Sequence, residues 1–216
     1  MMVLLFGPPG VGKGTQADLI FQTYHYKKCA TGDLLREEIK SKTTLGQEVD
    51  GYISQGFLVP DTIIFTIIEN FLEEQKDNDI LFDGFPRNPN QAKVLDDILT
   101  KLGLRLNIAI EMYLSEDEIV TRLGNRLYCT QCGSIYNLKT NPPQQERVCD
   151  TCQLDLVQRP DDKADVIRRR LSVYNSATQP LVAYYQKQGI YHQIDAQGSH
   201  TEVFDRIKRI IDDYTP

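Results

Sequence analysis

Short runs of mostly apolar residues recur along the chain, and amphipathic stretches separate them. The apolar runs are the length of strands that are buried on both faces, and they are residues 3–6, 80–82, 108–114 and 191–194. The helices that we expect between them include residues 13–24, 61–74 and 90–102. This alternation predicts an α/β fold in which helices cover both faces of a parallel sheet.

Two further helix starts carry a capping box, in which a hydroxyl cap is followed three residues later by an acid. Ser115 with Glu118 forms one box, and Ser199 with Glu202 forms the other. We therefore expect helices to begin directly after Ser115 and Ser199.

The core pattern is interrupted twice. Residues 31–59 are polar and helical in pattern, whereas residues 128–158 are rich in turn formers and contain Asn141-Pro142-Pro143. We expect both stretches to form lobes on the core rather than strands of its sheet.

Composition and charge narrow the function. The 216 residues are 41% apolar and 25% charged, as in one ordinary globular domain. The formal charge of −6 argues against adhesion to nucleic acid or anionic lipid. The apolar start of the chain stops at Gly7, too early for a signal sequence or a membrane span, so we expect a cytoplasmic protein.

A glycine-rich loop, residues 7–15, joins the first strand to the first helix. Main-chain N–H groups and the helix N-terminus can surround a polyphosphate there, and Gly10, Gly12 and Gly14 let the backbone approach closely. Lys13 can reach the outer phosphates, and Thr15 lies near the expected magnesium position; the general motif has Ser or Thr where Gly14 stands. A glycine turn without phosphate is the alternative, but the strand and helix context favours nucleotide binding.

Asp83 directly follows the second apolar run. A carboxylate there lies at the carboxyl edge of the sheet, where ligands of open α/β folds bind. It can hold Mg2+, most simply through water, although a lone Asp at a strand end is usually only a turn former.

Four of the five cysteines form two Cys-x-x-Cys pairs. Cys129 and Cys132, with Cys149 and Cys152, offer four thiolates on two tight turns, which suits tetrahedral Zn2+. Four protein ligands leave no position for substrate, so we expect a structural metal in a lobe too small to bury its own core. Cys29 is expected to be a buried apolar residue.

Three further stretches carry a family resemblance. They are residues 31–36 (TGDLLR), 56–61 (GFLVPD) and 83–87 (DGFPR) followed by Gln91. With the phosphate loop, they closely resemble adenylate kinases of the long bacterial type, from end to end. The resemblance implies a P-loop parallel sheet flanked by helices, with a small helical insertion that binds the nucleoside monophosphate and a zinc-binding lid insertion. The implied division is a core of residues 1–30, 60–124 and 163–216, a monophosphate lobe of residues 31–59 and a lid of residues 125–162.

The resemblance also implies an AMP site. Arg36 and Arg87 would clamp the monophosphate, since guanidinium forks match phosphate oxygens, and Thr31 and Gln91 would read the adenine. The full implied set is Thr31, Arg36, Gly56, Val59, Gly84, Arg87, Gln91, Arg159 and Arg170. Without the resemblance, the arginines would be surface charges and Gln91 a polar helix position.

Arginines in and around the second lobe match phosphate-binding arginines of the family. They are Arg122, Arg126, Arg159 and Arg170. Neighbours on a helix point about 100° apart, so the adjacent Arg168 and Arg169 are expected to be surface charges. Asn125 and Arg126 stand where two consecutive arginines are common in the family, so Asn125 departs from the pattern. Asp161 and Asp162 match acids that pair with lid arginines, although helix capping also explains them.

The implied reaction is transfer of the terminal phosphoryl group from MgATP to AMP, giving two ADP. The implied ATP-binding set is Gly10, Gly12, Lys13, Gly14, Thr15, Arg122 and Arg126, and the implied catalytic set is Lys13, Asp83, Arg87, Arg122, Arg159 and Arg170. The acceptor phosphate has a second pKa of about 6 and needs no general base, in keeping with three histidines in no catalytic setting.

Two alternatives stay open on the residues. The first is a kinase for another nucleoside monophosphate, or one that uses GTP on AMP. The second is a zinc ribbon for nucleic acid or protein partners whose phosphate loop powers a switch, which the acidic total argues against. We expect a monomer that binds ATP, AMP and ADP, without nucleic acid or membrane partners.

Overall fold

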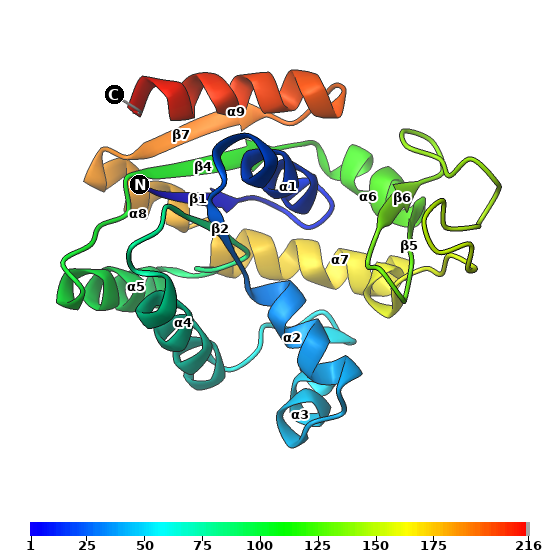
Figure 1. Cartoon of the computed structure of the whole chain (residues 1–216), viewed down its shortest axis with the longest axis horizontal. Coiled ribbons are helices and arrows are strands. Elements are labelled where there is room, and N and C mark those ends of the chain that lie inside the picture. Colours follow the sequence, from blue (N-terminus) through cyan, green and yellow to red (C-terminus); the bar gives the residue numbers. More distant parts are fainter. Residues whose placement is uncertain (215–216) are drawn as a thin grey trace.

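A five-stranded parallel sheet forms the centre of the molecule (Figure 1). The computed structural model describes residues 1–214, with only the main chain at Glu37 and Leu45. In the order in which they lie in the sheet, the strands are β2 (Lys27–Ala30), β3 (Ile80–Asp83), β1 (Met2–Phe6), β4 (Ile108–Tyr113) and β7 (Tyr191–Asp195). Because β1 lies in the middle, the loop that follows it emerges between the carboxyl ends of β3 and β4.

The predicted α/β fold is confirmed, and four of the five strands were expected. Strand β2 was not predicted, because its first half is the polar pair Lys27 and Lys28. Only Cys29 and Ala30 of this edge strand are buried. Cys29 is fully buried, as its apolar interpretation requires.

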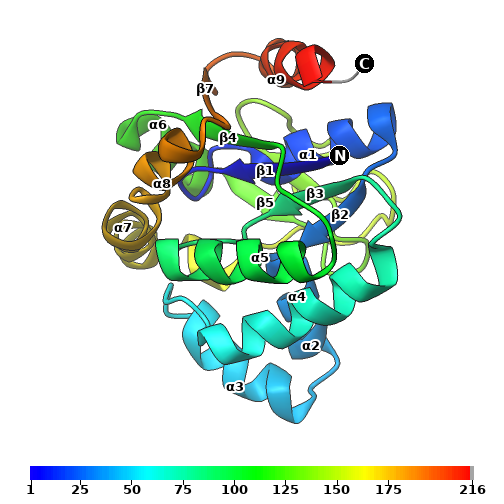
Figure 2. The ribbon, with the colours of Figure 1, turned by 90° about the vertical axis from the view of Figure 1, so that its left-hand side faces the viewer.

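Helices cover both faces of the sheet, as the edge view of Figure 2 shows. The helices of the core are α1 (Lys13–Tyr24), α4 (Asp61–Gln75), α5 (Pro89–Lys101), α6 (Glu116–Gly124), α7 (Ala164–Val173), α8 (Leu181–Gln188) and α9 (His200–Tyr214). Helices α1 and α9 lie on one face and α4, α5 and α8 on the other. Among the described residues no helix is long and apolar enough to cross a membrane.

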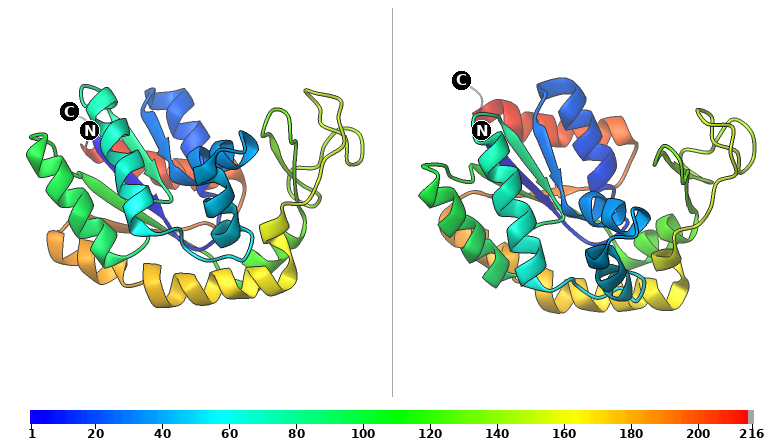
Figure 3. Two further views of the ribbon diagram at one scale, coloured as in Figure 1. Left: turned by 90° about the horizontal axis from the view of Figure 1, so that it is seen from below. Right: turned by 60° about the horizontal axis from the view of Figure 1, so that its bottom comes forward.

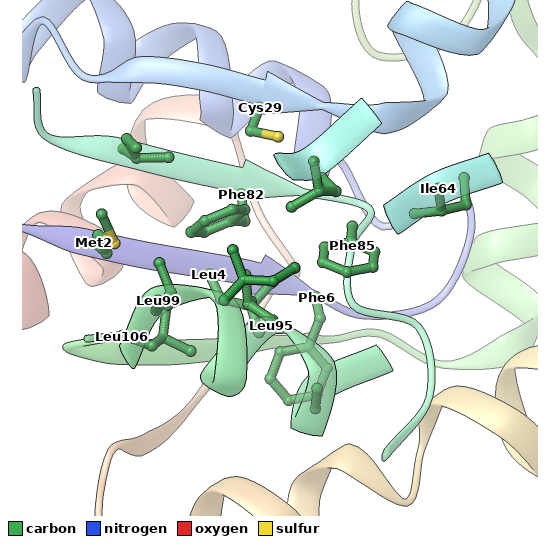
Figure 4. Close-up of a cluster of buried hydrophobic side chains, with 14 of the residues drawn as sticks. Met2, Leu4, Phe6, Cys29, Ile64, Phe82, Phe85, Leu95, Leu99 and Leu106 are labelled. Atoms are coloured by element: carbon green, nitrogen blue, oxygen red, sulfur yellow. The ribbon is translucent and has the colours of Figure 1, made fainter. Parts of the chain in front are cut away.

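Alternate residues of β1 supply two separate hydrophobic cores. Val3 and Leu5 pack with α1 and α9, whereas Leu4 and Phe6 pack with α4, α5 and α8. Figure 4 shows the second core, in which Leu4 lies among side chains of the neighbouring strand and α5. Truncating such a fully buried Leu to Ala costs about 2–5 kcal/mol.

Both predicted capping boxes stand at helix starts. Ser115 Oγ accepts from the main-chain N–H of Glu118 at 3.4 Å. At α9 the box is complete, because the N–H of Ser199 donates to Glu202 Oε2 (2.8 Å) and the N–H of Glu202 donates to Ser199 Oγ (3.3 Å). Each box satisfies N–H groups that have no partner within the helix.

The first insertion consists of two short helices, α2 (Thr31–Lys40) and α3 (Thr44–Ile53). Thr43 caps α3 by accepting from the N–H of Gly46 at 2.9 Å. A side chain at Gly46 would meet Glu38 O at 2.1 Å, so glycine permits the close crossing of the two helices. Figure 1 shows this lobe projecting from the core at the bottom of the view.

The second insertion is a small antiparallel hairpin with long turns. Strand β5 (Arg126–Tyr128) pairs with β6 (Ile135–Asn137). Its buried cluster contains only Leu127, Cys129, Tyr136, Cys149 and Leu156. The hairpin projects from the molecule in both views of Figure 3. A short 3-10 helix (Pro160–Asp162) then leads into α7.

Candidate active site

The glycine-rich loop connects β1 to α1 at the centre of the sheet edge. Three of its glycines have positive φ, +148° at Gly7, +79° at Gly10 and +107° at Gly12. A side chain at Gly7 would lie 2.4 Å from Met112 O, and one at Gly10 would lie 2.6 Å from Leu123 Cγ, so the loop packs directly on β4 and α6. Gly12 precedes α1 without a side-chain cap, which leaves the first N–H groups of the helix available to an anion.

Lys13 lies folded across this loop. Its Nζ donates to the carbonyl oxygens of Gly7 (2.9 Å) and Pro8 (3.0 Å). Burial lowers the pKa of Lys13 to about 8, while Asp83 opposes this shift and the nearby arginines add to it. The lysine is therefore a cation in a positively charged, poorly hydrated place, where a phosphate stabilises its charge.

Asp83 ends β3 beside the first turn of α1. Its Oδ2 lies 3.9 Å from the position of a side chain at Gly14. Burial raises the pKa of the Asp83 carboxyl, and Lys13 opposes that shift. Its carboxylate accepts no hydrogen bond from a residue that the structure describes, so its oxygens fit a hydrated magnesium ion next to Thr15.

Three predicted AMP-site residues meet at one carbonyl oxygen. Gly84 O accepts from Thr31 Oγ1 at 3.1 Å and from Arg87 Nε at 2.6 Å. Gly84 has φ +82°, and a side chain there would lie 3.1 Å from Arg87 Nη2 and 3.4 Å from Thr31 Oγ1. Arg36 approaches from α2, where Asp33 holds its guanidinium at 2.5 Å. The residues between β3 and α5 therefore bring Thr31 and Arg87 together, with Arg36 on the adjoining helix.

Gln91 is buried, and both halves of its amide are engaged within the protein. Its Oε1 accepts from the N–H of Arg87 at 2.7 Å, and its Nε2 donates to Asp61 Oδ1 at 2.6 Å. Asp61 is a partner that the sequence did not reveal. The structure thus gives Gln91 a part in holding the Arg87 segment, while its contact with a base stays a prediction.

The first insertion, residues 31–59, contacts α7 at Gly56. A side chain there would lie 2.9 Å from Arg170 Cγ and 3.1 Å from Val166 Cγ1, and Val59 is buried close by in the sequence. Arg169 is exposed, as expected of a surface charge, yet it also makes specific contacts with this lobe. Its Nη1 donates to Gln55 O at 3.1 Å, and its guanidinium lies 5.1 Å from the centroid of the Phe57 ring. The sequence pattern gave no signal of this contact.

Two acids organise the arginines between the lid and α7. Asp162 accepts from Arg126 Nε (2.6 Å) and Nη2 (2.5 Å) and lies 3.3 Å from Arg170 Nη1, while Asp161 lies 2.8 Å from the same Nη1. The predicted pairing of both acids with these arginines is confirmed. A bidentate pair orients the guanidinium as well as neutralising it.

Arg122 and Arg159 are held in other ways. Arg122 donates to Val11 O (3.3 Å) in the phosphate loop and to Ala196 O (3.1 Å), and so bridges two loops at the sheet edge. Arg159 lies 5.3 Å from the centroid of the Tyr128 ring, and its Nε is buried without a partner among the described residues.

Positive charges are concentrated between the phosphate loop and Gly84, and we call this group, Lys13, Arg87, Arg159 and Arg170, the cationic edge. The Arg87 side chain keeps an exposed surface, but desolvation by the surrounding chain, chiefly, lowers its pKa to about 10, and Arg170 adds to that shift. Burial also lowers the pKa of Arg159 to about 10, with contributions from Arg36 and Arg126. Cations that destabilise each other's charge in this way define a site for polyanions.

The four lid cysteines converge. Their Sγ atoms all lie within 4.8 Å of one another, and those of Cys132 and Cys149 are 3.7 Å apart. Tetrahedral zinc with Zn–S distances of about 2.3 Å places the sulfurs about 3.8 Å apart. Hydrogen bonds with Ser134 lower the pKa of Cys132 to about 6, whereas a hydrogen bond with Cys132 raises the pKa of Cys152. The donor set therefore fits zinc.

The parallel sheet, the glycine loop and the cationic edge define the protein as a phosphotransferase of the P-loop class. The sequence model of the family described as "Adenylate kinase" matches residues 5–190. Proteins named adenylate kinase are similar along their whole length. That of Pyrococcus abyssi is 42% identical over 98% of this chain and 96% of its own, and that of Methanococcoides burtonii is 44% identical over 99% and 100%. The chain belongs to the adenylate kinase family, and it is accordingly a nucleoside monophosphate kinase rather than a zinc ribbon with a switch.

Proposed function

We propose that the protein transfers the terminal phosphoryl group of MgATP to AMP, reversibly, giving two ADP. The observation that carries the proposal is the cationic edge between two prepared sites, the loop of residues 7–15 and the Thr31–Gly84–Arg87 cluster. The relatives are named adenylate kinases, which supports AMP as the acceptor.

The donor binds at the loop of residues 7–15 in this proposal. Main-chain N–H groups and Lys13 surround its phosphates, and Arg122 and Arg126 contact them from the lid side. Asp83 and Thr15 would hold Mg2+, which neutralises part of the phosphate charge when it is bound. Gly10, Gly12 and Gly14 keep the backbone close to the phosphates.

The acceptor nucleotide binds beside Gly84, at the Thr31–Gly84–Arg87 cluster. Arg36 and Arg87 grip its phosphate, Thr31 and Gln91 read its base, and Gly56 and Val59 line the base pocket. Arg159 and Arg170 would neutralise charge on the group in transfer. Catalysis by positioning and charge neutralisation is the usual means of phosphoryl transfer.

The acceptor oxygen needs no protein base, because the monophosphate is already largely ionised. The histidines agree with this. His25 ends α1 and His192 pairs with the Tyr214 hydroxyl at 3.1 Å, while His200 begins α9. None of the three contacts the cationic edge.

Water has to be excluded, or the donor would be hydrolysed. We assign this task to closure of two lobes, residues 31–59 and the zinc-bearing lid 125–162, over a core of residues 1–30, 60–124 and 163–216. The protein would act as a cytoplasmic monomer, with Zn2+ in the lid as a structural metal.

A coupled assay tests this function. ATP or GTP is offered as donor with each of AMP, GMP, CMP and UMP, and ADP or GDP formation is followed. The highest kcat/KM is expected for ATP with AMP. A clear preference for another acceptor, or for GTP, would replace the proposal with a kinase for that monophosphate or a GTP-dependent one.

Arg87→Ala tests the acceptor site. We expect kcat/KM for AMP to fall roughly 10²–10³-fold, as when one preorganised donor is removed. Arg105→Ala is the matched control, because Arg105 is exposed and lies with Met1 and Asn107 in a separate hollow at the amino end of the sheet. Undiminished activity of Arg87→Ala would refute the assigned role.

A further inference from the structure

The main chain of Arg87 is held at both of its polar groups by side chains. On one side, its N–H donates to Gln91 Oε1 at 2.7 Å. On the other, its carbonyl oxygen accepts from Thr178 Oγ1 at 2.8 Å. Thr178 is buried and lies 91 residues further along the chain. The position of the Arg87 peptide therefore depends on a distant segment.

That segment is a π-helical turn, Tyr174–Thr178, which continues α7. Such turns are rare and often lie at functional sites. The turn begins with Tyr174, whose hydroxyl donates to Glu111 Oε1 on β4 at 3.1 Å. The buried Glu111 carboxylate also accepts from Tyr191 (2.6 Å) and Gln193 (2.8 Å) on β7. The first residue of the turn is thus fixed to the sheet, and its last residue is fixed to Arg87.

The position of the Arg87 peptide determines where its guanidinium lies. Its Nε already donates to Gly84 O at 2.6 Å, so a shift of its peptide would move the guanidinium relative to Thr31 and Gly84. Loss of the Thr178 hydroxyl would also leave the part-buried Arg87 carbonyl oxygen without this donor.

We propose that Thr178 is a positioning residue for the acceptor site, whose hydroxyl aims Arg87 at the monophosphate. The turn also connects Arg87 to α7, which carries Arg170. It therefore holds Arg87 and Arg170 at fixed positions relative to each other. The inference rests on the proposed function, because it assigns Arg87 to the acceptor.

Thr178→Val and Thr178→Ser separate the hydroxyl from the shape of the side chain. Valine keeps the branched shape without the hydrogen bond, and serine keeps the hydroxyl. We expect Thr178→Val to lower kcat/KM for AMP about tenfold with KM for ATP unchanged within twofold, and Thr178→Ser to stay within about twofold of the wild type. An equal fall in kcat/KM for AMP in both variants would overturn the inference. So would a rise in KM for ATP as large as the rise in KM for AMP.

Ser176→Ala is the matched control within the same turn. The Ser176 hydroxyl is exposed and bonds only Ser172 O and Val173 O, so its loss should leave AMP kinetics unchanged. An effect as large as that of Thr178→Val would point to the stability of the turn instead. If Thr178→Val does not fold, Thr178→Ala takes its place with the same expected outcomes.

A double-mutant cycle shows whether Thr178 acts through Arg87. In an Arg87→Ala background, Thr178→Val should change kcat/KM for AMP by less than twofold. A full tenfold loss there would contradict the inference. Wild-type protein that makes no nucleoside diphosphate from any monophosphate would instead refute the proposed function itself, and the inference with it.

Discussion

Gly84 is the central residue of the proposed acceptor site. Its carbonyl oxygen binds both Thr31 and Arg87, and its missing side chain leaves room for the Arg87 guanidinium. Sequence patterns reveal a glycine but not what occupies the space beside it. The need for glycine here is therefore a structural finding.

Gly84→Ala should raise KM for AMP at least tenfold, because the new methyl group displaces Arg87 Nη2 and Thr31 Oγ1. Positive φ adds a cost of roughly 1–2 kcal/mol to folding. Gly103→Ala is the matched control, with φ +70° and no atom within 4 Å of the added carbon. Steady-state kinetics and thermal unfolding of both variants separate the two effects. Equal KM values for AMP in the two variants would contradict the role of Gly84.

At this scale the sequence revealed the chemical groups better than their partners. Lys13 and Asp83 were placed correctly at the sheet edge, because each directly follows a strand or its loop. By contrast, Gln91 binds Asp61 and Arg87 binds Thr178, pairs that lie 30 and 91 residues apart. Periodicity carries no information on such contacts, which depend on how the elements pack.

Among the elements, the second insertion is the one whose stability depends least on the packing of its own side chains. Its buried cluster is five residues, two of which are cysteines. So small a core cannot offset the entropy of ordering the hairpin, whereas a four-cysteine metal site can.

Protein purified without chelator should therefore contain one zinc or similar ion per chain. Removing it, or replacing Cys149 by Ser, should disorder the lid and lower kcat while the core keeps its main unfolding transition. Metal analysis and hydrogen exchange measure both effects. Cys29→Ala is the control, since Cys29 lies in β2, outside the lid, and its loss should leave the metal content unchanged. Metal-free protein with an ordered lid and full activity would rule out the site.

The contact of α7 with the first insertion, residues 31–59, is a second feature at the scale of elements. Arg169 reaches Gln55 O and the Phe57 ring, so the lobe of α2 and α3 is attached to the helix that carries Arg170. An exposed cation–π contact contributes about 0.5–1 kcal/mol.

Arg169→Met should raise KM for AMP about two- to fivefold by loosening this attachment, with KM for ATP unchanged. Arg168→Met serves as the control, because Arg168 is the exposed neighbour on the same helix. Initial-rate kinetics with each substrate varied in turn provide the measurement. Identical behaviour of the two variants would mean that the contact has no part in acceptor binding.

Over the whole molecule, the alternation of strands and helices was sufficient to predict the α/β fold, since buried parallel strands read as apolar runs. Strand β2 was not predicted, because it lies at the edge of the sheet and begins with two lysines. The strand order, β2-β3-β1-β4-β7, could not be read from the pattern, because it depends on which crossovers pack together.

The charge distribution of the whole chain is uneven in a way that serves this chemistry. The net charge is −6, yet cations from distant segments of the chain gather around the phosphate loop and Gly84. Two nucleotides that meet there, phosphates inward, would supply the missing negative charge. This meeting of two nucleotides is the central claim.

A crystal structure with a bisubstrate dinucleotide tests that claim most directly. We predict that the phosphates of one half lie on the main-chain N–H groups and Lys13 of the loop, and that the phosphate of the other half lies against Arg36 and Arg87. Either half bound elsewhere, or both halves on the loop side of Gly84, would contradict it.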